Sequence, residues 1–519
     1  MDVVVLLGLL LLGIVVLTPL AGRVGVPQPI ALTLFGLLLA LVPAVPTPQV
    51  PPEVILPLVL PPLLFAQTLR GSVRDLRADA RAVTVLAVVL TALSAAAVAG
   101  TAHLFGLPWA VAVVLGAVVA PPDPVAATAV ARKLRLPPRL VTVLEGEGQF
   151  NDATALTTYQ VALIAVVAGG IGVTEVGWRF ALQVLGGTAV GLAGGIAARA
   201  GLSRLSDASV ETTITLALPF GVYLVADALE SSGVLAVLAA GYFLRSRGQG
   251  ATTSAGWVLG RSVWRYVDFL VTGLLFGFLG LELTTALEDT SQLGNGHALV
   301  LAVAVVGVLV VVRALVVHGA SALAGRQARR RGSATPAGWR EATVASWAGM
   351  RGVVTVATAL ALPLTGADGP FPYRSEVVLV ALVTVLLTLV VQGLTLAPLV
   401  RLLGVGAPGS ADEDTRRLRR DATQAALRAV QDAAGVGERA RSTATTRYRA
   451  RLAHQNRIVG LFDEGEDEPE AVEELGRLMV AATDAERDVV QRARQAGEVS
   501  PAVADSVLLD VEARAARYE

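Results

Sequence analysis

Long runs of apolar residues, separated by short polar loops, occupy the chain from its start to about residue 403. Thirteen of these runs approach the roughly 20 residues that an α-helix needs to cross a bilayer. They lie at about 2–22, 29–45, 53–69, 82–105, 108–131, 140–168, 176–198, 210–228, 232–245, 263–283, 298–325, 342–364 and 376–400. The pattern predicts an all-α polytopic membrane protein with about 13 transmembrane helices.

Basic residues are distributed unevenly between the loops. Twenty Arg or Lys residues fall in every second loop, counted from the one that holds Arg23, whereas the other loops hold only Arg179 and Arg374. Cytoplasmic loops are enriched in Arg and Lys. We therefore expect a plasma-membrane protein with its N-terminus outside the cell and its C-terminus in the cytoplasm. The first run lacks a basic leader region and a cleavage site, which favours a transmembrane helix over a cleaved signal.

The amino-acid composition excludes several kinds of catalytic and metal-binding site. The 519 residues are 54% apolar and 16% charged, with a mean hydropathy of +0.63. The chain has no cysteine, which excludes disulfides, thiolate catalysis and Cys-type zinc or iron–sulfur sites. Its four histidines are scattered, which argues against a His-rich metal site. We expect no cofactor and no nucleic-acid partner.

Residues 404–519 are a separate, strongly charged region. A Gly/Pro linker at 404–409 opens it, and charges alternate with Ala and Leu at helical spacing over 415–434 and 470–495. We expect a cytosolic helical C-terminal region. The sequence leaves open whether this region is a plain appendage or a regulatory or dimer-stabilising domain.

Carboxylates interrupt the sixth apolar run. Glu145, Glu147 and Asp152 lie in it, and a charge near the bilayer centre costs at least ~2.5–3.5 kcal/mol. Asp152 follows Arg139 by 13 residues, about 20 Å along a helix axis, which places it near mid-membrane. Glu147 and Asn151 are four residues apart and share a helix face. We predict that Asp152, Asn151 and Glu147 contribute to an ion or proton site.

The fifth run contains a break at membrane depth. Pro121, Pro122 and Pro124 stand within four positions, and each removes a backbone donor and clashes one turn back. Broken helices in a membrane are tolerated only where they line a cavity or pack inside protein. Asp123 sits at this break, where it can cap the second half-helix, join the ion site, or do both.

The twelfth run contains a second break. Gly349 and Gly352 flank Arg351 and permit an unwound stretch, where the cation can offset exposed carbonyl ends and nearby carboxylates. The two broken runs are seven apart, so their directions are opposite. Broken helices at matching positions of two halves are typical of inverted-topology repeats.

Arg313 in the eleventh run is also near mid-membrane, because it precedes Arg326 at the inner end by 13 residues. A buried arginine needs a carboxylate partner. Glu147 and Asp123 are the candidates, and we favour Glu147.

Five motifs resemble those of one transporter family in their order and in the runs that carry them. The family is the monovalent cation:proton antiporters, which include bacterial NhaP-type antiporters and eukaryotic sodium/proton exchangers. The motifs are Leu60–Phe65, Asp123-Pro124-Val125-Ala126, Glu145-Gly146-Glu147 followed by Asn151-Asp152, Phe276–Leu283, and Gly349-Met350-Arg351-Gly352. The resemblance covers about residues 1–403.

The resemblance implies an NhaA-like fold with two helical bundles. A mobile core at about 82–168 and 298–400 would contain the crossing broken helices, and a bundle at about 1–70 and 176–283 would form a homodimer. It also implies a Na⁺ site at Asp152 and Asp123, a structural salt bridge between Glu147 and Arg313, and an elevator-like motion of the core.

We therefore predict a secondary active transporter, not an enzyme, that exchanges Na⁺ for H⁺ by alternating access, for pH and sodium homeostasis. Li⁺ and K⁺ are further candidate substrates. Asp152 would carry a proton or a cation, but not both, and this competition couples the two fluxes. A single titrating carboxylate beside neutral Asn151 indicates one proton per cation, hence electroneutral exchange. The partners are monovalent cations, protons, the lipid bilayer and a second copy of the chain.

Three positions depart from the family pattern and keep alternatives open. Pro122 and Gly148 stand where many relatives have Thr and Ser, and Ala66 stands where some have an acidic residue. Because these positions offer fewer side-chain oxygen ligands, a K⁺-preferring antiporter remains an alternative. An intramembrane enzyme would need paired catalytic aspartates or Asp-rich metal–diphosphate motifs, and a passive channel would need a continuous polar pore. Both remain remote alternatives.

Overall fold

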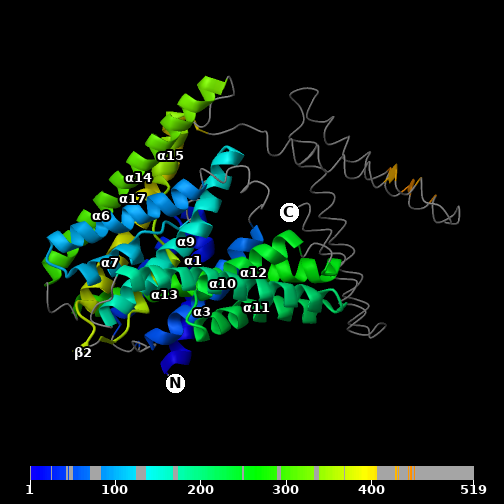
Figure 1. Cartoon of the computed structure of the whole chain (residues 1–519), viewed down its shortest axis with the longest axis horizontal. Coiled ribbons are helices and arrows are strands. Elements are labelled where there is room, and N and C mark those ends of the chain that lie inside the picture. Colours follow the sequence, from blue (N-terminus) through cyan, green and yellow to red (C-terminus); the bar gives the residue numbers. More distant parts are fainter. Residues whose placement is uncertain are drawn as a thin grey trace. The chain divides into compact units, whose positions relative to one another are not determined.

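The computed structural model is almost wholly helical in the part of the chain that it describes (Figure 1). The described residues are 2–24, 26–42, 45, 51–70, 83–123, 136–167, 173–247, 251–288, 294–331, 338–366 and 369–405, with a few single positions between 427 and 449. The chain divides into two compact units, Met1–Ala407 and Pro408–Glu519. The tail helices predicted at 415–434 and 470–495 lie outside the described residues, apart from those single positions.

Each of the thirteen predicted runs contains a described helix or pair of helices. These elements are α1 (Asp2–Val24), α2 (Gln28–Ala40), α3 (Pro52–Arg70), the π-helix η1 (Val85–Leu90), α6 (Thr91–Leu104), α7 (Trp109–Val119), α9 (Pro138–Val167), α10 (Val173–Leu202), α11 (Ala208–Ala228), α12 (Gly233–Arg247), α13 (Ser254–Glu288), α14 (Asn295–Arg331), α15 (Trp339–Trp347), α16 (Val353–Leu360) and α17 (Arg374–Leu403). A short antiparallel hairpin, β1 (Thr365–Gly366) and β2 (Gly369–Pro370), joins α16 to α17. Eight described spans are long and apolar enough to cross a membrane, while the total of thirteen stays a prediction.

Helix α13 is longer than the run at 263–283 predicts. It begins at Ser254, because the preceding Thr253 caps it: the Thr253 Oγ1 accepts from the Gly256 N–H at 3.0 Å. The buried Glu211 carboxylate accepts from the Thr253 N–H at 3.0 Å and fixes this cap on α11. Two arginines that the sequence assigns to a loop, at 261 and 265, therefore lie inside the helix.

Two large apolar clusters account for most of the buried residues that the structure describes, beside a small one at Leu6, Leu10 and Leu281. One is built mainly by α6, α7, α14, α16 and α17, and the other mainly by α10, α11 and α12. Figure 1 shows α6, α14 and α17 side by side at one edge, with α10, α11 and α12 grouped away from them. Helices α3, α9 and α13 contribute side chains to both clusters. These three helices therefore form the boundary between the two halves of the unit.

Glycines allow close helix contact at one crossing. A Cβ atom at Gly36 of α2 would lie 1.9 Å from the Gly277 carbonyl oxygen of α13, and one at Gly280 would lie 2.1 Å from the Thr33 carbonyl oxygen. Lipid tails are as apolar as leucine, so membrane helices associate through tight packing of small residues. The α2–α13 pair therefore depends on bare backbone at these positions.

We predict that Gly280→Ala lowers the thermal stability of the purified protein in detergent. The added methyl group meets backbone atoms that cannot rotate away, and overpacking of this kind costs about 1–3 kcal/mol. Gly307→Ala on α14 is the matched control, because a Cβ atom there meets nothing within 4 Å. Equal melting temperatures for the two variants would contradict the packing.

Candidate ion-binding site

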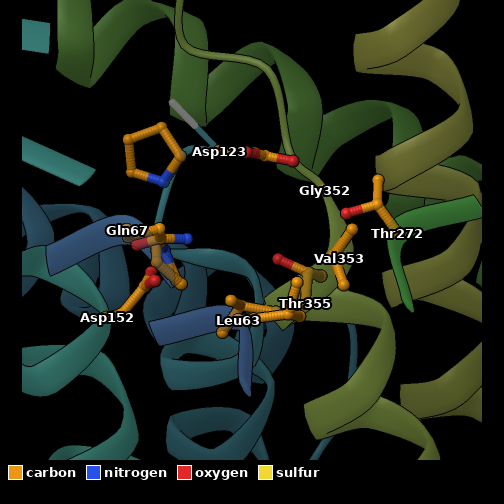
Figure 2. Close-up of a pocket in the computed structure, with 11 residues that line it drawn as sticks. Leu63, Gln67, Asp123, Asp152, Thr272, Gly352, Val353 and Thr355 are labelled. Carbon is orange, nitrogen blue, oxygen red and sulfur yellow. The ribbon is translucent and has the colours of Figure 1, made fainter. Parts of the chain in front are cut away.

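A small cavity lies where the two broken helices meet α3, α9 and α13 (Figure 2). Its volume is about 20 Å³, enough for about one water-sized group. The lining residues are Leu63, Gln67, Pro121, Pro122, Asp123, Asp152, Thr272, Gly352, Val353, Val354 and Thr355. The cavity therefore lies at the boundary between the two apolar clusters, and it contains two of the predicted site residues, Asp123 and Asp152.

Asp152 is positioned by the middle of α9, a helix of 30 residues. The residue is only 2% exposed, and its Oδ2 atom has no hydrogen-bond partner in the structure. Buried polar atoms are almost always paired, so an unpaired carboxylate oxygen that faces a cavity indicates a ligand position. Figure 2 shows the Asp152 carboxylate on the same side of the cavity as Gln67.

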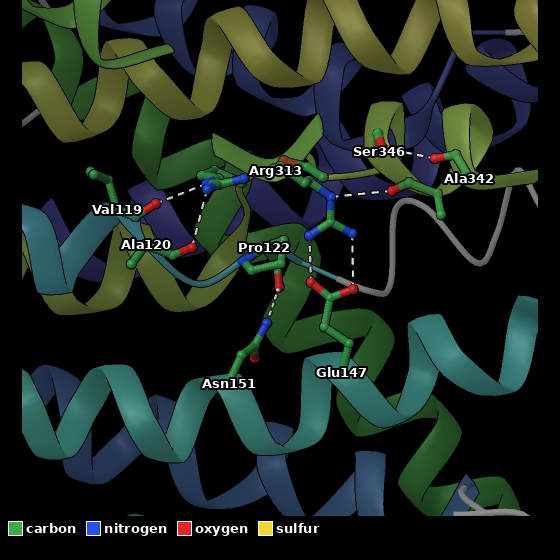
Figure 3. Close-up of polar contacts among 11 residues, drawn as sticks. Val119, Ala120, Pro122, Glu147, Asn151, Arg313, Ala342 and Ser346 are labelled. Atoms are coloured by element: carbon green, nitrogen blue, oxygen red, sulfur yellow. Dashed lines mark hydrogen bonds and ion pairs between the residues drawn. The ribbon is translucent and has the colours of Figure 1, made fainter. Parts of the chain in front are cut away.

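The prolines of the first break leave backbone carbonyls without their helical donors. Pro121 and Pro122 have no N–H, and the Asp123 N–H donates instead to the Met350 carbonyl oxygen at 2.6 Å, in the second break. The neighbouring Asn151 on α9 donates from Nδ2 to the Pro122 carbonyl oxygen at 3.1 Å (Figure 3). Asn151 therefore holds the break against α9. Pro124 lies outside the described residues.

Arg351 supplies the donors that α7 lacks at its end. Its Nε donates to the Val119 carbonyl oxygen at 2.8 Å, and its Nη2 donates to the Ala120 carbonyl oxygen at 3.1 Å. Nη1 donates to the Gly349 carbonyl oxygen, and the Arg351 N–H donates to Thr388 Oγ1 at 3.0 Å. The side chain is buried, so these bonds satisfy a guanidinium and several carbonyls that water does not reach. The two predicted breaks thus cross and hold each other.

Gly352 is required by the approach of Asp123. A Cβ atom at Gly352 would lie 1.7 Å from Asp123 Oδ2, so any side chain there would displace the carboxylate. Asp123 is partly buried, and it faces the first turn of α16, where the helix dipole favours a negative charge. The second break therefore presents a glycine backbone so that this carboxylate can reach the cavity.

Glu147 and Arg313 form a buried, two-pronged ion pair between α9 and α14 (Figure 3). Arg313 Nη2 donates to Glu147 Oε2 at 2.9 Å, Nη1 donates to Oε1, and Nε donates to the Ala345 carbonyl oxygen of α15 at 3.2 Å. The two side chains are 2% and 3% exposed. A Cβ atom at Gly349 would lie 2.4 Å from the Arg313 side chain, so this glycine makes room for the pair.

This geometry separates the two roles that the sequence gives to Glu147. Both of its carboxylate oxygens accept from Arg313, and the residue does not line the cavity. Its position is that of the predicted structural partner of Arg313. Its predicted part in ion binding has no support in this arrangement.

Three polar residues of the cavity wall were not predicted from the sequence. Gln67 interrupts the apolar pattern of α3 two residues after Phe65, and this polar residue was a usable signal. Thr272 and Thr355 gave no comparable signal, because threonine is common in apolar helices, where it usually bonds a carbonyl of the preceding turn. Among the described residues, no group of three or more His, Cys, Asp or Glu is arranged for a metal ion.

Comparison with known proteins identifies the family. A family model described as "Sodium/hydrogen exchanger, transmembrane" matches residues 8–402, which is most of the chain. The chain belongs to the sodium/hydrogen exchanger family. This membership confirms the resemblance carried by the five motifs, and it makes the protein an ion transporter that exchanges cations for protons rather than an enzyme.

Relatives and solved structures agree with this assignment. An uncharacterized Na⁺/H⁺ exchanger of Mycobacterium tuberculosis H37Rv is 35% identical over 428 residues, which are 81% of this chain and 78% of the relative. The Na⁺/H⁺ antiporter ApNhaP of Aphanothece halophytica is 30% identical over 387 residues, which are 73% of this chain and 70% of that relative. The sodium proton antiporter MjNhaP1 of Methanocaldococcus jannaschii has a similar fold, with a TM-score of 0.61 and 18% identity over 78% of this chain and 100% of that structure.

We predict that Glu147→Gln and Arg313→Gln each destabilise this exchanger, because each leaves the other buried group without its partner. Removing one partner of a buried pair costs about 3–5 kcal/mol. The double variant should lose less than the sum of the single losses, as measured by unfolding titrations in mixed detergent. Arg340→Gln is the control, because Arg340 is exposed. Strictly additive losses would contradict the pairing.

Proposed function

We propose that this protein exchanges Na⁺ for H⁺ and that Asp152 is the group that binds either ion. The observation that carries the proposal is the Asp152 Oδ2 atom, which is buried, has no partner and faces a cavity with room for one small ion. Alkali cations are hard ions that prefer oxygen ligands. The two relatives described above are named Na⁺/H⁺ exchangers or antiporters, which supports Na⁺ as the cation.

Competition at one carboxylate couples the two fluxes. When Na⁺ enters, the Asp152 carboxylic acid releases its proton and the resulting carboxylate binds the cation. When a proton returns, it displaces Na⁺ and restores the neutral acid. Asp123, the second carboxylate on the cavity wall, adds negative charge that attracts the cation. In both loaded states the charge of Asp152 is neutralised, whereas the empty carboxylate is costly to move through the membrane.

One proton per cation follows from the groups that are available. Asn151 is neutral and has no proton to exchange, and its Nδ2 donates to the Pro122 carbonyl oxygen. The Glu147 carboxylate is held by Arg313. We propose that Asp123, the other carboxylate on the cavity wall, stays charged while Asp152 exchanges its proton, so that the exchange is electroneutral with a stoichiometry of one to one.

We propose that the cavity moves between the two sides of the membrane by motion of a core against a dimerisation bundle. The core is the predicted region at 82–168 and 298–400, and the bundle is the one at 1–70 and 176–283. The cavity lies where α9 and α16 of the core face α3 and α13 of the bundle, which is where relative motion would change access.

The distribution of basic residues supports a cytoplasmic C-terminus, an external N-terminus and a place in the plasma membrane, for pH and sodium homeostasis.

The choice of cation has one alternative. Pro122 and Gly148 lack the hydroxyls that are common in the family at these positions, which keeps a K⁺-preferring exchanger open. A direct comparison of Na⁺, Li⁺ and K⁺ decides the preference.

We predict that Asp152→Asn abolishes exchange in proteoliposomes with an acidic lumen and a pH-sensitive dye. Adding Na⁺ outside should alkalinise the lumen with wild-type protein, and the asparagine variant should give no response because it cannot release a proton. Responses to Li⁺ and K⁺ rank the cations. An imposed membrane potential should leave the wild-type rate unchanged if the exchange is electroneutral.

Asp207→Asn is the matched control for this experiment. Asp207 accepts from the Ser209 and Val210 N–H groups at 2.9 Å as the N-cap of α11, and asparagine caps equally well. This variant should exchange at the wild-type rate. A wild-type rate from Asp152→Asn would exclude Asp152 as the coupling group, and cation flux without proton movement would indicate a channel.

A further inference from the structure

Two threonine hydroxyls on the cavity wall have no hydrogen-bond partner. They are Thr272 Oγ1 on α13 and Thr355 Oγ1 in the first turn of α16. Threonines in helices usually donate to a carbonyl one turn back, as Thr157 does to Ala153 at 2.7 Å and Thr358 does to Val354 at 2.6 Å. Thr272 has a helical turn before it and yet makes no such bond.

The unpaired hydroxyls coincide with the unpaired carboxylate oxygen. Five described threonine hydroxyls are buried without a partner, and the two on this cavity face it together with Asp152 Oδ2. Figure 2 shows the Thr272 and Thr355 side chains across the cavity from Asp152. Buried oxygens rarely stay unpaired in native proteins. Three of them on the wall of one small cavity indicate a shared ligand that coordinates to oxygen atoms.

We propose that Thr272 Oγ1 and Thr355 Oγ1 are neutral ligands of the transported cation and complete an oxygen shell with the Asp152 carboxylate. This proposal rests on the proposed function. The ligand is a dehydrated alkali cation, because hydroxyl lone pairs replace the water oxygens that the ion loses on entry. These hydroxyls supply oxygen ligands in place of the Thr and Ser hydroxyls that many relatives have at positions 122 and 148, where this chain has Pro122 and Gly148.

The two threonines belong to different parts of the transporter. Thr355 lies with Asp152 in the predicted core, whereas Thr272 lies in the predicted dimerisation bundle. If the core carries the ion, Thr355 travels with it and Thr272 stays behind. The site would then have its full set of ligands only when the core is placed as in this structure. Thr272 therefore sets a difference in cation affinity between the two sides of the membrane.

Valine variants test the two ligands by binding, without transport. Valine keeps the shape of threonine and removes the hydroxyl. We expect Thr355→Val and Thr272→Val to raise the apparent Kd for Na⁺ about 3- to 10-fold, the change that the loss of one neutral hydrogen-bond partner typically gives. The readout is the rise in melting temperature with NaCl, corrected for ionic strength with a bulky organic cation.

Matched variants distinguish the effect of losing the hydroxyl from the effect of changed packing. Thr358→Val on α16 removes a hydroxyl that is bonded to its own helix, and it should keep the wild-type Kd. Thr355→Ser and Thr272→Ser keep the hydroxyl and should bind Na⁺ nearly as wild type does. If the serine and valine variants shift equally, or if neither valine variant shifts, the ligand assignment is wrong.

The KM for Na⁺, measured from each side of the membrane, then tests whether Thr355 moves with the core while Thr272 stays in the bundle. In proteoliposomes with protein of one orientation, Thr355→Val should raise the KM for Na⁺ on both faces and Thr272→Val on one face only. An equal effect of Thr272→Val on both faces would contradict the assignment of the two threonines to different moving parts. The proposed function fails separately, if wild-type protein exchanges no cation for protons or if Asp152→Asn still exchanges. Intact exchange with unchanged KM in both valine variants overturns the threonine assignment alone.

Discussion

The bonds from Arg351 to the carbonyls at the end of α7 are the interaction on which the site depends. The prolines after α7 remove backbone donors at a depth where water does not supply replacements. A guanidinium has five N–H donors in a fixed plane, and Arg351 donates three hydrogen bonds from it, to the carbonyl oxygens of Val119, Ala120 and Gly349. The charge also lies at the C-terminal end of a half-helix, where the dipole is negative. One side chain from the second break thus makes the first break stable.

The crossing in turn determines where negative charge can lie. Because the breaks replace regular helix, Asp123 reaches the start of α16 over the bare backbone of Gly352. The Glu147–Arg313 pair fixes α9 against α14, one turn from Asn151, and Asn151 fixes the break against α9. These bonds engage Glu147 and the Asn151 amide nitrogen, whereas the Asp152 Oδ2 atom stays unpaired. A rigid surround with one unsatisfied carboxylate oxygen is well suited to binding one small cation or one proton.

Much of this arrangement could be predicted from sequence, because charges and prolines are conspicuous in apolar runs. The two breaks, the acidic stretch of α9 and the pairing of Arg313 with Glu147 follow from the cost of burying such groups in lipid. The roles of Thr272 and Thr355 could not be predicted, since a hydroxyl that bonds its own helix and one that faces a cavity leave the same pattern. The start of α13 was missed because its first turns carry arginine, which hydropathy assigns to a loop.

The most direct test of the central claim is the number of protons released when Na⁺ binds. Calorimetric titrations of purified protein with NaCl, in buffers of different ionisation enthalpy near the pH at which the site is half protonated, give this number without transport. Wild-type protein should release a fraction of one proton per Na⁺ bound, approaching one as the pH falls, and Asp152→Asn should release none. Na⁺ binding with no proton release at any pH, or release that persists in the asparagine variant, would contradict competition at Asp152.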